Sequence, residues 1–196
     1  MVRKITKINI IMQFLNDYNR KYYLRELAFL LKKPHQSIKP YVEELVKESA
    51  LIKTSRKNLT EYNLNLKNTR IYDYLTIAEK EKLIEKLKQE PLLEVLFEKL
   101  SSFFINNTFI VFGSAAEKIK KGSDIDLLII GKSNINKILE EIEEVYNKKI
   151  HKIQVNNINS LNHTIIKEIY KKHLIFNNTE QIVRFFGNLN EKNRLV

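Results

Sequence analysis

Residues 112–130 read FGSAAEKIKKGSDIDLLII, and this stretch decides the fold of the second half of the chain. The apolar run TFIVF is closed by Gly113 and Ser114, which is typical of a buried strand. The next apolar run, DIDLLII, predicts a second strand headed by Asp124 and Asp126. Alternate residues of a strand face the same side, so both carboxylates lie on one face, about 6.6 Å apart. Desolvating two like charges in a core is costly, and the pair therefore indicates a site for a divalent cation.

These two strands stand in an alternation of helices and strands. Residues 149–155, KIHKIQV, alternate like a third strand, and LIF predicts a short further strand. Helical periodicity predicts four helices around them, PLLEVLFEKLSSFF, INKILEEIEEVYNKK, SLNHTIIKEIYKKH and TEQIVRFFGNL. This order predicts a small mixed-sheet α/β domain over residues 92–196.

The Gly-Ser and Asp-x-Asp pairs carry a resemblance to a known family. Nine residues, 115–123, separate Ser114 from Asp124, and GSDIDLLII completes the pattern. The pattern resembles the nucleotidyltransferase superfamily of the DNA polymerase beta type, specifically its small stand-alone members, the minimal nucleotidyltransferases. The resemblance implies a set of roles: Asp124 and Asp126 as catalytic residues and ligands of Mg²⁺ (or Mn²⁺), and Gly113, Ser114, Lys118 and Lys121 as the binding site of a nucleoside triphosphate, with ATP as the expected nucleotide.

The chemistry of phosphoryl transfer explains these residue types. A glycine lets the backbone approach a phosphate closely, and the first N–H groups of a helix are free to bind it. Bound cations would bridge the phosphates and neutralise charge on the leaving pyrophosphate. The family usually carries a third carboxylate on the next strand, but the predicted strand 149–155 contains none, and we expect Gln154 or a neighbour at that position. An amide is a poor Mg²⁺ ligand, so the sequence supports nucleotide binding more strongly than turnover.

The first third of the chain has a different character. Residues 1–70 contain 15 basic and 6 acidic side chains, a net charge of +9, whereas the whole chain carries +11. Three amphipathic helices are predicted, the second ended by Pro34 and the third begun near Gln36 with Ser37 as its N-cap. Two alternating strands joined by the polar segment 55–58 follow them.

Helix, helix, helix and a basic hairpin resemble the winged helix-turn-helix family of DNA-binding domains. The segment YLRELAFLLKKPHQSIKPYVEELVKESALIKT carries this resemblance. In that family the third helix enters the major groove and the hairpin tip contacts phosphates. The resemblance therefore implies DNA-binding roles for residues of the third helix and of the hairpin: Gln36, Ser37, Lys39, Tyr41, Lys53, Arg56 and Lys57. Winged helices also serve as protein-interaction modules, and this alternative stays open.

Composition excludes several classes of protein. The 196 residues contain no cysteine, which excludes disulfides, thiol catalysis and thiolate metal sites. The four histidines show no metal-ligand spacing. No apolar run approaches the roughly 20 residues of a membrane span, and no signal-peptide pattern is present. We expect a cytoplasmic protein without a membrane partner.

The sequence as a whole predicts an α+β protein of two domains. We expect a winged helix-turn-helix domain at 1–70, a linker helix at 71–91 and a nucleotidyltransferase-like domain at 92–196. Three functions remain open at this point. One is an enzyme that transfers a nucleoside monophosphate from ATP to a protein or nucleic-acid hydroxyl. The second is a transcription regulator that binds duplex DNA and carries a non-catalytic nucleotide sensor. The third is an antitoxin that modifies a partner toxin.

Overall fold

The computed structural model describes residues 5–56, 59–120 and 122–191, and it divides the chain into two compact units. The first unit is Met1–Glu79 together with Val183–Val196, and the second is Lys80–Ile182. These borders differ from the predicted domain borders, because the end of the last helix clusters with the first unit. The described part of the chain has no helix that is both long enough and apolar enough to cross a membrane.

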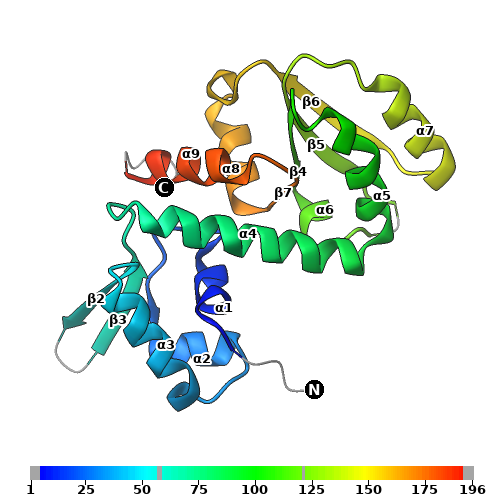
Figure 1. The fold of residues 1–196 in the computed structure, drawn as a ribbon. Helices are drawn as coiled ribbons and strands as arrows, with labels where there is room; N and C mark the ends of the chain where they lie inside the picture. Colours follow the sequence, from blue (N-terminus) through cyan, green and yellow to red (C-terminus); the bar gives the residue numbers. More distant parts are fainter. Residues whose placement is uncertain (1–4, 57–58, 121, 192–196) are drawn as a thin grey trace. The chain divides into compact units, whose positions relative to one another are not determined.

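The first unit contains the helices and strands predicted for a helical module with a hairpin (Figure 1). Its elements are α1 (Lys7–Ile11), η1 (Met12–Phe14), β1 (Tyr22–Tyr23), α2 (Leu24–Leu30), α3 (His35–Lys47), β2 (Leu51–Arg56), β3 (Leu59–Leu64) and the first part of α4 (Arg70–Gln89). Ile38, Val42 and Leu45 of α3 are fully buried, and Lys39 and Glu43 are exposed. This pattern makes one face of α3 part of the core and leaves the other face to solvent.

Two details of this unit differ from the sequence prediction. Helix α3 begins at His35 after Pro34, so Ser37 lies inside its first turn and donates its hydroxyl proton to the Pro34 carbonyl at 2.7 Å. Strand β1 was not predicted, because two residues are too short to show a periodicity. It pairs with β3 and completes a three-stranded antiparallel sheet of order β1-β3-β2.

The second unit is built on a four-stranded sheet of order β6-β5-β4-β7 (Figure 1). Its strands are β4 (Thr108–Phe112), β5 (Ile125–Ile130), β6 (Ile150–Val155) and β7 (His173–Ile175). Its helices are the end of α4, α5 (Pro91–Leu100), η2 (Ser101–Phe103), α6 (Ser114–Glu117), α7 (Asn136–Tyr146), η3 (Ile158–Ser160), α8 (His163–Lys171) and the start of α9 (Thr179–Glu191). Strand β5 runs antiparallel to β4 and parallel to β6, and β7 runs antiparallel to β4.

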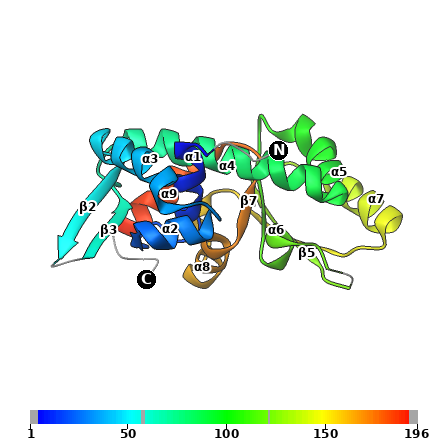
Figure 2. The same cartoon turned by 90° about the horizontal axis from the view of Figure 1, so that it is seen from below.

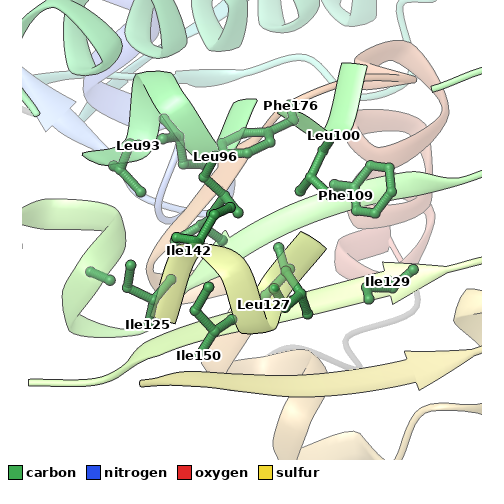
Figure 3. Close-up of a cluster of buried hydrophobic side chains, with 14 of the residues drawn as sticks. Leu93, Leu96, Leu100, Phe109, Ile125, Leu127, Ile129, Ile142, Ile150 and Phe176 are labelled. Carbon is green, nitrogen blue, oxygen red and sulfur yellow. The ribbon is translucent and has the colours of Figure 1, made fainter. Parts of the chain in front are cut away.

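One face of this sheet packs on α5 and α7. Buried side chains of the two helices meet alternate residues of the central strands, among them Ile125, Leu127 and Ile129 (Figure 3). Ile125 and Leu127 are both fully buried. Because side chains alternate across a strand, Asp126 lies on the opposite face, which is the side of the sheet where α8 lies (Figures 1 and 2). The apolar run therefore fixes the direction in which its carboxylate points.

Candidate functional site

Gly113 stands where β4 ends and α6 begins, in a conformation that side-chain-bearing residues rarely adopt. Its φ is +69° and its ψ is −147°, and its N–H donates to the carbonyl of Lys172 at 3.0 Å. A Cβ atom at this position would lie 2.8 Å from Oδ2 of Asp126. The absence of a side chain therefore leaves room for the carboxylate and for a ligand beside it. Ser114, the first residue of α6, is exposed next to this space.

Asp126 faces the Gly113 turn across the sheet, because Phe112 and Asp126 are register partners in β4 and β5. Its side chain is 34% exposed. Asp124 precedes β5 and is exposed. Within the described residues, neither carboxylate accepts a hydrogen bond. Two acidic groups thus share one corner of the sheet without the N–H donors that usually stabilise a buried carboxylate.

The surroundings of Asp126 disfavour its charged form. Burial raises the pKa of Asp126 above its ordinary value of 3.8, and the negative charges of Asp124 and Glu168 raise it further, whereas His151 opposes the shift. A cation placed between the carboxylates would reverse this effect, because an opposite charge favours the ionised form. The electrostatics of this corner therefore fit a positively charged ligand.

The neighbour of Asp126 on β6 corrects one expectation from the sequence. His151, not Gln154, pairs with Asp126 in the parallel β5–β6 register, and its Nδ1 lies 3.8 Å from Oδ1 of Asp126. Gln154 lies at the other end of the strand, where its amide donates to the carbonyls of Gly131 and Ser133 at 3.1 Å each. The residue beside Asp126 on the next strand is therefore a histidine, and not an amide.

Glu168 is a second residue that the sequence prediction left out of the site. It lies on α8, it is exposed, and its carbonyl accepts the N–H of Lys172, whose own carbonyl accepts the N–H of Gly113. Two backbone hydrogen bonds thus connect Glu168 to the glycine turn. No motif could have revealed it, because the sequence places it 42 positions after Asp126 and on a helix.

The basic residues near this corner have different environments. Lys118 is exposed, and its backbone N–H donates to the carbonyl of Ser114 at 3.0 Å at the end of α6. Lys121 lies outside the described residues. Lys172 makes an ion pair with Glu117 at 2.9 Å and was not predicted.

The donor set suits a divalent cation that is shared with a ligand. The part of the chain that the structure describes contains no cluster of three or more His, Asp or Glu side chains arranged to hold a metal by themselves. Asp124 and Asp126 supply oxygen atoms, and Mg²⁺ is commonly held by one or two carboxylates together with substrate phosphates and water. The residues therefore fit a cation that enters with a triphosphate, rather than a resident structural ion.

The predicted DNA-binding residues partly converge in the first unit. Lys39 of α3 and Lys53 of β2 line one open cavity of about 660 Å³, together with Tyr23, Leu24, Arg25, Glu26, His35, Glu43, Leu59, Thr60 and Tyr62. Gln36 and Ser37 are exposed and Tyr41 is half-buried, and none of the three lines this cavity.

The remaining predicted contacts of the first unit belong to the hairpin. Arg56 is the last residue of β2, and Lys57 lies outside the described residues. Arg25 and His35 were not predicted, although both line the cavity beside Lys39 and Lys53. Periodicity predicts each helix separately. It does not show which exposed residues of two helices and a hairpin line the same cavity.

Comparison with known proteins gives one informative match. No curated protein matches the chain. A solved toxin-antitoxin structure with AMP-PNP has 9% identity and a TM-score of 0.38, and the match covers 51% of this chain and 86% of that one. A mutant of the toxin-antitoxin MntA-HpeT has 7% identity and a TM-score of 0.36, with coverage of 50% and 84%. Residues 98–181, which include the whole corner described above, match the family model of the polymerase beta nucleotidyltransferases. This segment is therefore similar to a nucleotidyltransferase domain of the polymerase beta family.

Proposed function

We propose that the second unit binds a nucleoside triphosphate together with a divalent cation and transfers the nucleoside monophosphate to a hydroxyl group. The observation that carries this proposal is the glycine turn, where Gly113 has no room for a Cβ beside the Asp126 carboxylate. The similarity of residues 98–181 to the polymerase beta nucleotidyltransferases supports this reaction class. ATP is the expected nucleotide, and Mg²⁺ or Mn²⁺ the expected cation.

Each residue of the corner has a role in this reaction. Gly113 and Ser114 would bind the triphosphate through a backbone that approaches closely and through the exposed hydroxyl. Asp124 and Asp126 would hold the cation, which when bound neutralises the charge of the phosphates. The acceptor hydroxyl loses its proton to solvent and its oxygen bonds to the α-phosphorus, while the bond from the α-phosphorus to the oxygen bridging the β-phosphate breaks and pyrophosphate leaves with that oxygen. Whether the acceptor belongs to a nucleic acid, a protein or a partner toxin stays a prediction.

Thermal unfolding with nucleotide tests the binding step. A ligand that binds only the folded state stabilises it by about 2.7 kcal/mol at a concentration 100 times its Kd. We expect ATP with Mg²⁺ or Mn²⁺ to raise the Tm, and Asp124→Asn to abolish the rise without unfolding the protein. Asp73→Asn, in the first turn of α4, is the matched control and should keep the rise. If millimolar ATP with either cation does not raise the Tm of the wild type, the proposal is contradicted.

Release of pyrophosphate tests the transfer step. Incubation of the wild type with labelled ATP, the cation and candidate acceptors should yield pyrophosphate, and Asp126→Asn should abolish the yield. Binding without release would instead identify the second unit as a nucleotide sensor.

We propose a second function, binding of duplex DNA by the first unit. It is favoured by the cavity that brings Lys39 and Lys53 next to Arg25 and His35, although Glu26 and Glu43 also line it. Nζ of Lys39 lies 3.7 Å from Oε1 of Glu43, one turn further along α3, so the carboxylate balances part of the charge of Lys39. The excess of basic residues over residues 1–70 supplies the long-range attraction to a polyanion.

The salt dependence of binding tests this second function. Lys39→Ala and Lys53→Ala should each weaken binding to duplexes of any sequence and reduce the slope of log K against log salt by about one unit per lost contact. Lys47→Ala is the control, because Lys47 is exposed on the same helix but does not line the cavity. A wild type that does not bind duplex DNA at low salt excludes the proposal.

A further inference from the structure

His151 is held beside Asp126 by the sheet itself. The two residues are register partners on adjacent parallel strands, so their side chains leave the sheet on the same face. The pairing of β5 with β6 therefore holds His151 beside Asp126 in every side-chain rotamer. No loop movement is needed to bring the two groups together.

The imidazole has no packing role that would explain its position. The His151 side chain is 85% exposed, and within the described residues its ion-pair geometry with Asp126 is the polar contact it makes. The side chain is therefore not part of the apolar core and does not stabilise the fold by burial. The exposed ring can rotate toward a cation bound by Asp126.

The distance between the two groups suits ligands of a single cation. Ligand atoms about 2.1 Å from one cation stand about 3.0 Å apart at a right angle and about 3.4 Å apart at a tetrahedral angle. Nδ1 of His151 and Oδ1 of Asp126 are 3.8 Å apart. A shift of well under about 1 Å, within reach of one exposed side-chain rotation, brings both atoms to the same ion.

The chemistry of the nitrogen ligand then decides which cation is held. Mg²⁺ prefers oxygen ligands and keeps its water. Imidazole suits later transition ions such as Fe²⁺ and Zn²⁺ best, and Mn²⁺, the first of that series, accepts it more readily than Mg²⁺ does while still taking oxygen ligands. We propose that His151 is a ligand of the cation bound by Asp126, and that it makes this site prefer Mn²⁺ over Mg²⁺. The inference rests on the proposed nucleotide-binding function, because the triphosphate supplies the remaining oxygen ligands.

Spectroscopy of bound Mn²⁺ tests the coordination directly. The full-length protein with α,β-methylene-ATP, whose α–β bridge cannot be cleaved and contains no nitrogen, and Mn²⁺ should show a ¹⁴N coupling from imidazole in the pulsed electron paramagnetic resonance spectrum. The coupling should vanish in His151→Gln and persist in His163→Gln, an exposed histidine at the start of α8. Bound Mn²⁺ without a ¹⁴N coupling in the wild type overturns the inference.

Competition between Mn²⁺ and Mg²⁺ tests the preference. We expect His151→Gln to lower the ratio of Mn²⁺ to Mg²⁺ affinity about tenfold or more, since loss of even an outer ligand contact typically costs that much. His151→Asp should lower the ratio as well, by improving the binding of Mg²⁺. A ratio that His151→Gln leaves unchanged rejects the inference while the nucleotide site stands. Absence of any bound cation with α,β-methylene-ATP rejects the proposed function itself.

Discussion

The two ends of the four-stranded sheet use polar residues in opposite ways. At the end where β4 begins, Asn177 accepts the N–H of Phe109 at 2.9 Å and donates to the carbonyls of Phe104 and Asn107. Asn107 in turn donates to Ser133 Oγ at 2.8 Å and accepts the N–H of Ser133. At the other end, Asp124 and Asp126 accept no hydrogen bond within the described residues.

The difference separates structure from function within one sheet. Polar groups that close a fold are buried and paired, because an unpaired buried group costs about 1–3 kcal/mol. Groups that bind a ligand often lie close to like charges and without hydrogen-bond donors, as Asp126 does beside Asp124 and Glu168. The end with Asn177 should therefore govern stability, and the end with Asp126 should govern binding.

Asn177→Ala should give the largest loss of stability. Asn177 is 7% exposed, and its removal leaves the N–H of Phe109 and two carbonyls without their partner. We expect the free energy of unfolding to fall by about 3 kcal/mol, measured by urea denaturation. Nucleotide affinity should be unchanged in the protein that remains folded. A substantial loss of affinity would mean that the two ends are coupled.

Gly113→Ala should damage both stability and binding. The positive φ costs about 1–3 kcal/mol with a side chain, and the new Cβ must displace the Asp126 carboxylate. We expect this destabilisation together with loss of the nucleotide-dependent rise in Tm. Gly122→Ala is the matched control, because Gly122 has a φ of +79° and no atom within 4 Å of an added Cβ. Gly122→Ala should lower the stability through backbone strain but keep the nucleotide-dependent rise in Tm.

Asp126→Asn should have the smallest effect on stability, and unlike the two changes above it should stabilise the protein slightly. The pKa of Asp126 is raised in the folded state, so the stability linked to its proton is fully present below the unfolded value of 3.8 and is lost as the pH rises through the folded pKa. At neutral pH the variant without ligand should melt slightly above the wild type, by less than the roughly 4 °C that 1 kcal/mol gives a chain of this length. The difference should disappear toward pH 3.

Glu168→Gln sharpens the same comparison. Its charge is one cause of the raised pKa of Asp126, and its removal should bring that pKa closer to 3.8. Titration of the Asp126 carboxyl by NMR measures the shift. Glu180→Gln, in the first turn of α9, serves as the control and should leave the titration unchanged. An unchanged titration in Glu168→Gln would remove Glu168 from the site.

Local patterns were sufficient where burial is one-sided or complete. The apolar runs before Gly113 and after Asp124 predicted β4 and β5, and the alternation across β5 predicted which side chains enter the core. The helices α5, α7 and α8 follow from periodicity for the same reason, since each buries one apolar face. The register of β6 could not be predicted this way. It is an edge strand with exposed residues on both faces, so its sequence fits more than one pairing.

The sequence by itself thus determined the strand that ends at Gly113 and the strand that carries Asp126, because each follows from rules that act over a few neighbouring residues. Asp124 precedes β5, so its place on the same face as Asp126 stays a prediction. Only the tertiary structure decided that His151, and not Gln154, stands beside Asp126, and that Glu168 approaches from a helix. It also decided that Tyr22 and Tyr23 form a strand with β3. These contacts join residues far apart in the chain, and they depend on how whole elements pack, which no local pattern encodes.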